Sequence, residues 1–270
     1  QCGVNRNRGE KGFCRATARV KVYSAHPHFG EERPLVGRRG SGTIFFSHCN
    51  LRCVFCQNWE INHRGDGAHI SDYELAELML RVQEMGCHNI NLVTPTHVVP
   101  NIVSAVRLAA QRGLEIPLVY NCGGYESLEV LRLLDGVVDI YLPDFKYMDG
   151  EQAARYSSGA SDYPEVAAAA IKEMYRQVGD VVVDEDGIAL RGLMIRHLVM
   201  PNNIAGTDRF VRWVAEELSP LTYVNIMGQY RPEYKAFEYP QIARRISREE
   251  YRQALQWAVE AGLKRIDAFL

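Results

Sequence analysis

Apolar residues recur along this chain in a helical period that is interrupted by short continuous runs. In residues 71–85 the spacing is helical, and the apolar positions are Leu75, Leu78, Met79, Val82 and Met85. Ser71 and Glu74 have the spacing of a capping box at the start of this segment, and Gly86 follows its end. Residues 89–93, Asn-Ile-Asn-Leu-Val, then have the pattern of a short strand. The pattern predicts a helix followed by a buried strand.

The same pairing of strand and helix continues along the chain. We predict further strands at 43–46, 116–120, 137–142, 192–199 and 221–227. We predict further helices at 100–112, 126–134, 162–177, 207–217 and 247–261, and a hairpin around Asp186-Gly187. Strands that alternate with helices favour βαβ units in a parallel sheet, and about six units are too few for a closed eight-stranded barrel. We therefore expect an α/β fold, a partial (β/α)6 TIM-like barrel.

The beginning of the chain lacks this pattern. Residues 1–35 are polar and rich in glycine and arginine, so we expect a short irregular, cysteine-containing N-terminal segment before a barrel at 36–270. Cys2 and Cys14 lie in this segment, and two cysteines alone cannot complete a metal site. The acids Glu31 and Glu32 are expected on a solvated face, with a place in the site as the alternative.

Composition excludes some classes of protein. The 270 residues are 47% hydrophobic and 24% charged, as in soluble globular proteins, and are enough for a barrel-sized core. The net charge of −2 gives no electrostatic case for nucleic acid or an anionic membrane. No apolar run approaches the roughly 20 residues that span a bilayer. The start lacks Met and a signal-peptide pattern, so we expect a chain that begins inside a longer protein. Seven cysteines, an odd number with three of them clustered, indicate a reducing compartment, and we expect a cytoplasmic protein.

Three clustered cysteines carry the clearest chemistry. Cys49, Cys53 and Cys56 follow the strand predicted at 43–46 with the spacing C-x3-C-x2-C. Three soft thiolates suit an iron–sulfur cluster, and a four-iron cluster with three protein ligands keeps one iron open for a substrate or cofactor. Structural zinc needs a fourth ligand, which His48 could supply, and a disulfide framework is a further alternative. Clustering in an enzyme-sized chain favours iron–sulfur over both.

The motif C-x3-C-x-aromatic-x-C, with Phe55 before Cys56, resembles the cluster motif of the radical S-adenosylmethionine (SAM) enzymes. The longer string GSGTIFFSHCNLRCVFCQNWEIN resembles the branch related to pyruvate formate-lyase activating enzyme, and matching phrases cover nearly the whole chain. The resemblance implies a partial barrel with a 4Fe-4S cluster on Cys49, Cys53 and Cys56. It also implies reductive cleavage of SAM to methionine and a 5′-deoxyadenosyl radical, which removes a hydrogen atom from a substrate.

Polar residues follow each of the six predicted strands. In parallel barrels the chemistry lies on the loops after these strand ends. SAM presents an amine, a carboxylate, a ribose and an adenine, so its pocket needs acceptors, cations and hydroxyl partners. We therefore expect the SAM pocket among the strand-end residues, with Thr94, Thr96, His97, Asn121, Asp144, Lys146, Arg196 and Gln229 as the candidate cofactor-binding residues.

The resemblance implies roles for three of these residues. Asp144-Phe145-Lys146 resembles an Asp-x-Lys phrase in which the lysine lies near SAM, and a structural Lys–Asp pair is the alternative. Arg196 resembles an arginine on the fifth strand, whose guanidinium suits a carboxylate. Asn121 lies in a phrase that resembles a Thr-Asn-Gly turn, where a ribose contact is expected.

Two strand ends depart from the family pattern. Many relatives carry a Gly-Gly-Glu turn that binds the SAM amine, and this chain has Thr94-Pro95-Thr96-His97 there. The threonines offer hydroxyl or carbonyl acceptors or form a plain turn, and His97 is either a contact or a structural histidine. Gln229 lies near the position of a SAM-contacting histidine that this chain lacks. Cys122 is interpreted as apolar filler rather than as a hydrogen-atom donor.

The expected function is an activase that installs a glycyl radical on a protein partner, or another protein-modifying radical enzyme. Radical chemistry on a small molecule is the alternative within the same family. A non-catalytic iron–sulfur or zinc protein is the alternative of another class. The resemblance to radical SAM enzymes implies an electron donor such as flavodoxin or ferredoxin. Cysteines before Gln1 would decide whether Cys2 and Cys14 belong to a second metal site.

Overall fold

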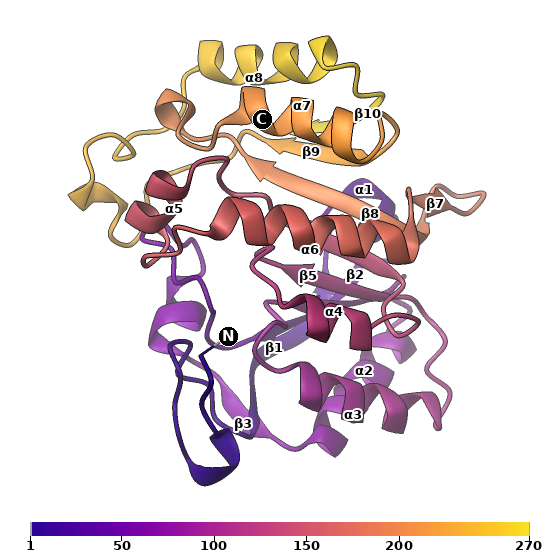
Figure 1. The fold of residues 1–270 in the computed structure, drawn as a ribbon. Helices are drawn as coiled ribbons and strands as arrows, with labels where there is room; N and C mark the ends of the chain where they lie inside the picture. Colours follow the sequence, from indigo (N-terminus) through magenta and orange to yellow (C-terminus); the bar gives the residue numbers. More distant parts are fainter. Residues whose placement is uncertain (1, 270) are drawn as a thin grey trace.

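A computed structural model describes residues 2–269, in which a single sheet winds through the molecule (Figure 1). Its strands are β1 (Val20–His28), β2 (Ser41–Phe46), β3 (Ala68–Ile70), β4 (Ile90–Val93), β5 (Leu118–Cys122), β6 (Ile140–Pro143), β7 (Val182–Val183), β8 (Ala189–Leu198), β9 (Tyr223–Met227) and β10 (Arg265–Phe269). The helices are α1 (Arg33–Val36), α2 (Asp72–Glu84), α3 (Val99–Ala110), α4 (Leu128–Leu133), α5 (Gly150–Tyr156), α6 (Tyr163–Val178), α7 (Thr207–Glu217) and α8 (Arg248–Glu260). Short helical turns occur at η1 (Arg6–Arg8), η2 (Glu60–Arg64), η3 (Pro201–Asn203) and η4 (Ala236–Glu238).

The strand order is β10-β9-β8-β6-β5-β4-β2-β1-β3, with β7 paired to β8. From β2 through β4, β5, β6, β8 and β9 to β10 every neighbouring pair is parallel. Strand β1 pairs antiparallel with β2 and β3. Within the described residues β10 and β3 end this order, so the sheet is an open, partial barrel. All six predicted strands are present, and the predicted α/β partial barrel is confirmed.

Strands β1 and β10 extend the sheet beyond the apolar pattern. Strand β1 lies in the segment expected to be irregular, and its valines are mixed with histidines, Ser24 and Pro27. A register shift between Val22 and Ser24 further blurs the period of two. This strand pairs along the whole of β2, so part of the N-terminal segment belongs to the sheet. The division at residue 35 stays a prediction, and Gln1 and Leu270 lie outside the described residues.

Helices cover the outer face of the sheet. In Figure 1, α4 and α6 lie in front of the strands, α7 and α8 lie over β9 and β10, and α2 and α3 lie at the opposite end. The predicted capping box of α2 is confirmed, because the Ser71 hydroxyl accepts from the Glu74 amide while the Glu74 carboxylate accepts from the Ser71 amide. Ser247 and Glu250 form a second capping box at α8. No helix within residues 2–269 is long and apolar enough to cross a bilayer.

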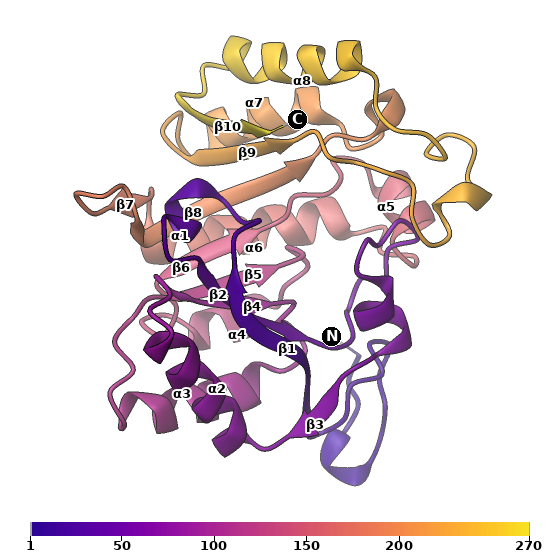
Figure 2. The same cartoon turned by 180° about the vertical axis from the view of Figure 1, so that it is seen from behind.

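Helix α1 and the loop before it fill one end of the barrel interior, on the side that faces the viewer in Figure 2. Leu35 is fully buried in an interior cluster with Val119, Ile140, Leu142 and Met194. Glu32 is 2% exposed, and the Glu31 side chain contacts the partly buried Arg196. The expectation that these two acids lie on a solvated face is therefore wrong, because residues at the far end of the chain supply their partners.

Candidate active site

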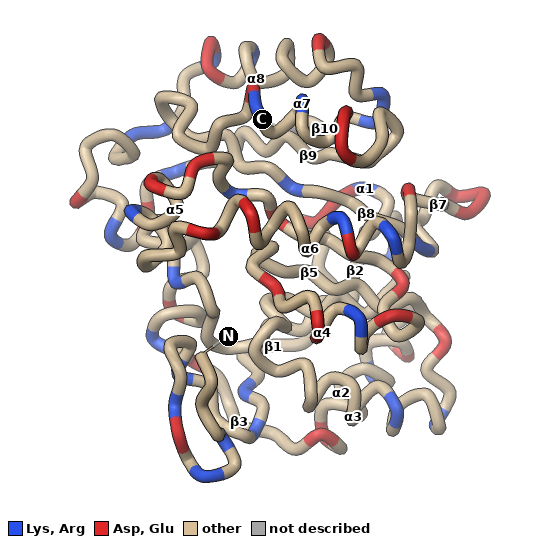
Figure 3. Tube along the Cα trace, viewed as in Figure 1, with Lys and Arg blue, Asp and Glu red and all other residues tan. Residues whose placement is uncertain are grey.

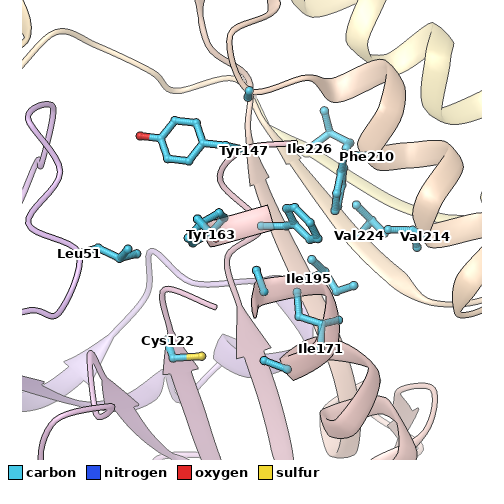
Figure 4. Close-up of a cluster of buried hydrophobic side chains, with 14 of the residues drawn as sticks. Leu51, Cys122, Tyr147, Tyr163, Ile171, Ile195, Phe210, Val214, Val224 and Ile226 are labelled. Atoms are coloured by element: carbon cyan, nitrogen blue, oxygen red, sulfur yellow. The ribbon is translucent and has the colours of Figure 1, made fainter. Parts of the chain in front are cut away.

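The cysteine loop leaves β2 and is anchored by two apolar side chains. Leu51 is 1% exposed and packs so close to Gly123 that a Cβ added there would lie 2.8 Å from Leu51 Cδ1. Phe55 packs edge-on against Tyr147 and Tyr230, with ring centroids 6.4 and 5.9 Å away. In Figure 4, Leu51 and Tyr147 lie in the same buried cluster as Cys122. These contacts fix the loop at the mouth of the barrel.

All three loop cysteines are free thiols that receive or share polar contacts. The Leu51 amide donates to Cys49 Sγ at 3.4 Å, and Asn62 Nδ2 donates to Cys56 Sγ at 3.3 Å. Cys53 Sγ lies 2.9 Å from the hydroxyl of Ser157. Donors that point at cysteine sulfur stabilise a thiolate and tune an iron–sulfur cluster. The donor set therefore fits a cluster held by three thiolates.

When no metal is bound, burial disfavours the charged thiolate form of these three cysteines. It raises the pKa of Cys53 to about 12 and the pKa of Cys56 to about 11, and it also raises the pKa of Cys49. Metal coordination deprotonates a thiol outright. Within residues 2–269 no three His, Cys, Asp or Glu side chains converge closely enough to hold one metal ion. A four-iron cluster does not need such convergence, because each cysteine binds a different iron, whereas a structural zinc ion does.

A cavity of about 230 Å³ lies beside the loop, over the C-terminal ends of the parallel strands. Its lining brings together nine of the eleven residues proposed from the sequence: Cys49, Cys53, Cys56, Thr94, Asn121, Asp144, Lys146, Arg196 and Gln229. These residues come from the loop after β2 and from the ends of β4, β5, β6, β8 and β9. Thr96 and His97 line a neighbouring cavity instead.

A charged network occupies one wall of this cavity. Asp144 Oδ2 accepts from Lys146 Nζ at 2.6 Å, and Asp144 Oδ1 accepts from Arg196 Nε at 2.9 Å. Burial alone would raise the pKa of Asp144, but the two cations hold it below its usual range. Arg196 also donates to Asn121 Oδ1 at 2.5 Å and to Glu31 Oε2 at 3.3 Å. All three guanidinium nitrogens of Arg196 therefore have protein partners, whereas Lys146 keeps donor capacity for a ligand.

Tyr163 ties the ends of β5 and β6 together. Its hydroxyl accepts from the Lys146 amide at 2.9 Å and lies 2.9 Å from the carbonyl oxygens of both Gly123 and Asp144. Gly124 has φ +80°, and a Cβ there would lie 2.4 Å from the Asp144 carbonyl oxygen. Figure 4 shows Tyr163 within the cluster of buried hydrophobic side chains. This packing sets the position from which Asp144 and Lys146 enter the cavity.

The turn after β4 separates its two threonines. Thr94 has φ +60°, a left-handed conformation that is costly for a β-branched residue, and it lines the cavity. The Thr96 hydroxyl donates to Glu126 Oε1 at 2.6 Å. His97 Nε2 lies 2.7 Å from the Ser47 carbonyl oxygen and so carries the ring proton. Thr96 and His97 thus hold neighbouring loops together.

Glu126 was not anticipated from the sequence. It is 3% exposed and lines the neighbouring cavity of about 350 Å³, and its Oε2 accepts from the Tyr120 hydroxyl at 2.9 Å. Burial raises the pKa of Glu126 to about 7 despite hydrogen bonds from Thr96, Tyr120 and Cys122. Asn62 and Ser157 were missed as well, and for Glu31 a place in the site was only the alternative to a solvated face. A single acid or amide in a loop carries no signal in the sequence, because its partners lie on other strands.

The parallel sheet, opened as a partial barrel with a three-cysteine loop at its mouth, defines an α/β barrel protein whose cavity is lined by thiols and by charged and polar side chains. The chain matches the Radical SAM superfamily over residues 43–185, which is more than half of its length. It belongs to the radical SAM superfamily, as the resemblance of the cysteine motif predicted.

Other known proteins are similar to this chain in sequence or in fold. An uncharacterised protein of Methanocaldococcus jannaschii is 37% identical over 274 residues, which cover 97% of this chain and 73% of that protein. SuiB of Streptococcus suis, in a structure bound to S-adenosylmethionine, aligns with a TM-score of 0.53 at 8% identity over 83% of this chain. Native anSMEcpe, with bound AdoMet and a peptide, aligns with a TM-score of 0.50 at 14% identity over 82%. The chain spans 48% of SuiB and 60% of anSMEcpe, and at these identities the likeness shows the fold.

Proposed function

We propose that this protein binds a 4Fe-4S cluster on Cys49, Cys53 and Cys56 and cleaves SAM reductively in the barrel cavity. The observation that carries the proposal is the lining of that cavity, where three free thiols face Asp144 and Lys146. When bound, the cluster and SAM supply a 5′-deoxyadenosyl radical, which removes a hydrogen atom from a substrate. A non-catalytic iron–sulfur or zinc protein would not need the charged side chains that line the cavity together with the thiols.

Within this proposal the protein orients SAM by charge and by backbone acceptors. Lys146 has donors left after its contact with Asp144, so we assign it to the SAM carboxylate. Arg196 is assigned to hold Asp144 and Asn121 in place, because its nitrogens already have partners. This assignment differs from the carboxylate grip suggested by the family resemblance.

The SAM amine needs an acceptor in place of the Gly-Gly-Glu turn. Thr94 lies on the cavity wall in a left-handed conformation, and its amide donates to the Asn121 carbonyl oxygen at 2.8 Å. We assign the carbonyl or hydroxyl oxygen of Thr94 to the amine, and Asn121 and Gln229 to the polar groups of ribose and adenine. Backbone strain at such a position is typical of binding sites.

We further propose that the hydrogen atom comes from a protein or peptide, as in a glycyl-radical activase. The support is the resemblance of residues 40–62 to the activating-enzyme branch, together with the peptide bound in the anSMEcpe structure. A one-electron carrier of the flavodoxin or ferredoxin type completes the reaction that we propose.

The test uses the reconstituted protein with dithionite, SAM and an extract of the source organism grown in heavy water. Deuterium is measured in 5′-deoxyadenosine after incubation with the macromolecular or the small-molecule fraction of that extract. We expect deuterium from the macromolecular fraction and none with the Cys53→Ala variant. Transfer from the small-molecule fraction alone would overturn the protein substrate, and absence of 5′-deoxyadenosine would overturn SAM cleavage itself.

A further inference from the structure

The N-terminal segment places a concentration of positive charge beside the cluster loop. Residues 2–21 contain six Lys or Arg and one Glu, although the whole chain has a net charge of −2. Figures 1 and 3 show this segment and the cluster loop on the same side of the molecule. The basic residues therefore lie on one region of an otherwise weakly acidic protein.

Three cations lie in or beside the cysteine loop. The guanidinium of Arg52 lies over the exposed ring of Phe13, 5.8 Å from its centroid. Arg15 follows Phe13 by two residues in the chain and is exposed. The Lys235 amide donates to the carbonyl oxygen of Val54 in the cysteine loop at 2.9 Å. Arg52 itself is part of the loop, so these cations lie close to the cysteines. We call Arg15, Arg52 and Lys235 the basic surface.

The basic surface lacks compensating acids. Throughout residues 2–269 no carboxylate lies within 4.0 Å of a charged nitrogen of Arg15, Arg52 or Lys235. Arg64 and Arg231, on neighbouring segments, do form ion pairs. Unpaired like charges raise the local potential and attract an acidic partner over a distance of about 10 Å at physiological salt.

Aromatic side chains lie between these cations. Trp59 and Tyr234 stack with centroids 5.5 Å apart, and Lys235 Nζ lies 5.7 Å above the Tyr234 ring. Phe13 is 48% exposed. Arginine and large aromatic residues are enriched in protein–protein interfaces. The surface thus combines charge for steering with rings for contact.

We propose that the basic surface docks an acidic one-electron carrier protein of the flavodoxin or ferredoxin class. The inference rests on the proposed function, because it requires a cluster on the loop. The inner side of the loop faces the cavity assigned to SAM, so the outer side is the face through which an electron can enter. One electron passes from the reduced carrier to the oxidised cluster, and no bond or proton is exchanged.

The test compares two reductants in the reconstituted protein. The double variant Arg15→Glu/Lys235→Glu changes two exposed residues that are not cavity residues, and Arg81→Glu/Arg252→Glu is the matched control on α2 and α8. The initial rate of 5′-deoxyadenosine formation is measured at low salt with dithionite and with an acidic ferredoxin that is reduced beforehand. We expect the ferredoxin-driven rate to fall about tenfold or more in the double variant and not in the control. The dithionite-driven rate stays within twofold.

An unchanged ferredoxin-driven rate in the double variant would overturn the docking surface. An equal fall with both reductants would mean that the substitutions damage the cluster. In that case the salt dependence of the ferredoxin-driven rate of the wild type tests the docking surface. That rate must drop as salt rises from 50 to 500 mM, because screening weakens the attraction, and a flat profile refutes the proposal. Absence of 5′-deoxyadenosine from the wild type with dithionite would instead refute the proposed function.

Discussion

Glu126 offers a quantitative test of the arrangement behind the cysteine loop. The carboxyl is buried between the loops after β4 and β5, and burial raises its pKa from 4.5 to about 7. The substitution Glu126→Gln keeps the shape and an acceptor for Thr96 or Tyr120 but cannot ionise. The two proteins must therefore differ in how their stability depends on pH.

The direction and size of this pH dependence of stability follow from the pKa of Glu126 in the folded and in the unfolded protein. The folded protein keeps Glu126 protonated up to about pH 7, whereas the unfolded chain releases the proton near pH 4.5. The stabilisation of the folded protein by protonated Glu126 is complete below pH 4.5 and is lost as pH rises through about 7. At 1.36 kcal/mol per pH unit the difference amounts to about 3 kcal/mol, most of it between pH 5 and pH 8. Above pH 7 the wild type carries a buried charge that the variant lacks.

The assay is urea unfolding of the reconstituted protein at pH 5 and pH 8, for wild type, Glu126→Gln and the control Glu129→Gln. Glu129 is exposed on α4, near Glu126 in the chain. We expect the wild type to lose about 2–3 kcal/mol more than Glu126→Gln between the two pH values, and the control to follow the wild type. Parallel profiles for all three proteins would refute the assignment of a buried, protonated carboxyl.

Three further substitutions test individual contacts. Thr94→Gly should raise the free energy of unfolding by about 0.5–1 kcal/mol, because glycine relieves the left-handed strain, and a lower melting temperature would contradict this. Lys146→Met should weaken SAM binding by roughly 10–100-fold in calorimetry at unchanged iron content, because a charged hydrogen bond is lost. Unchanged SAM affinity would leave Lys146 a purely structural partner of Asp144. Ser157→Ala should shift the cluster potential to more negative values in a redox titration, because Cys53 loses a hydroxyl contact, and a shift to positive values would contradict this.

The fold could largely be predicted because its signals are local. Each parallel strand from β2 to β9 is a segment rich in apolar residues, and the capping box at Ser71 lies within four residues. The cysteine loop is equally local, so its position at a strand end followed from the chain alone. Strand β1 could not be predicted, because mixed polar residues become a strand only through pairing with β2.

The surroundings of the site depend on contacts between distant segments. Glu31 is buried because Arg196, far along the chain, supplies its counter-charge. Thr96 turns away from the barrel cavity because Glu126, on the next strand's loop, accepts its hydroxyl hydrogen. No periodicity or spacing in the sequence indicates such pairs. The sequence therefore located the strand ends correctly but could not decide which side chains at each end face the cavity.

The central claim is that the three thiols and the charged cavity form one SAM-cleaving site. The most direct measurement is the 5′-deoxyadenosine formed per protein after anaerobic reconstitution and reduction with dithionite, alongside the iron content. We predict about four irons and formation of 5′-deoxyadenosine for the wild type, and loss of both for Cys53→Ala. A wild type that holds four irons yet leaves SAM intact, or a Cys53→Ala variant that still cleaves it, would contradict the account.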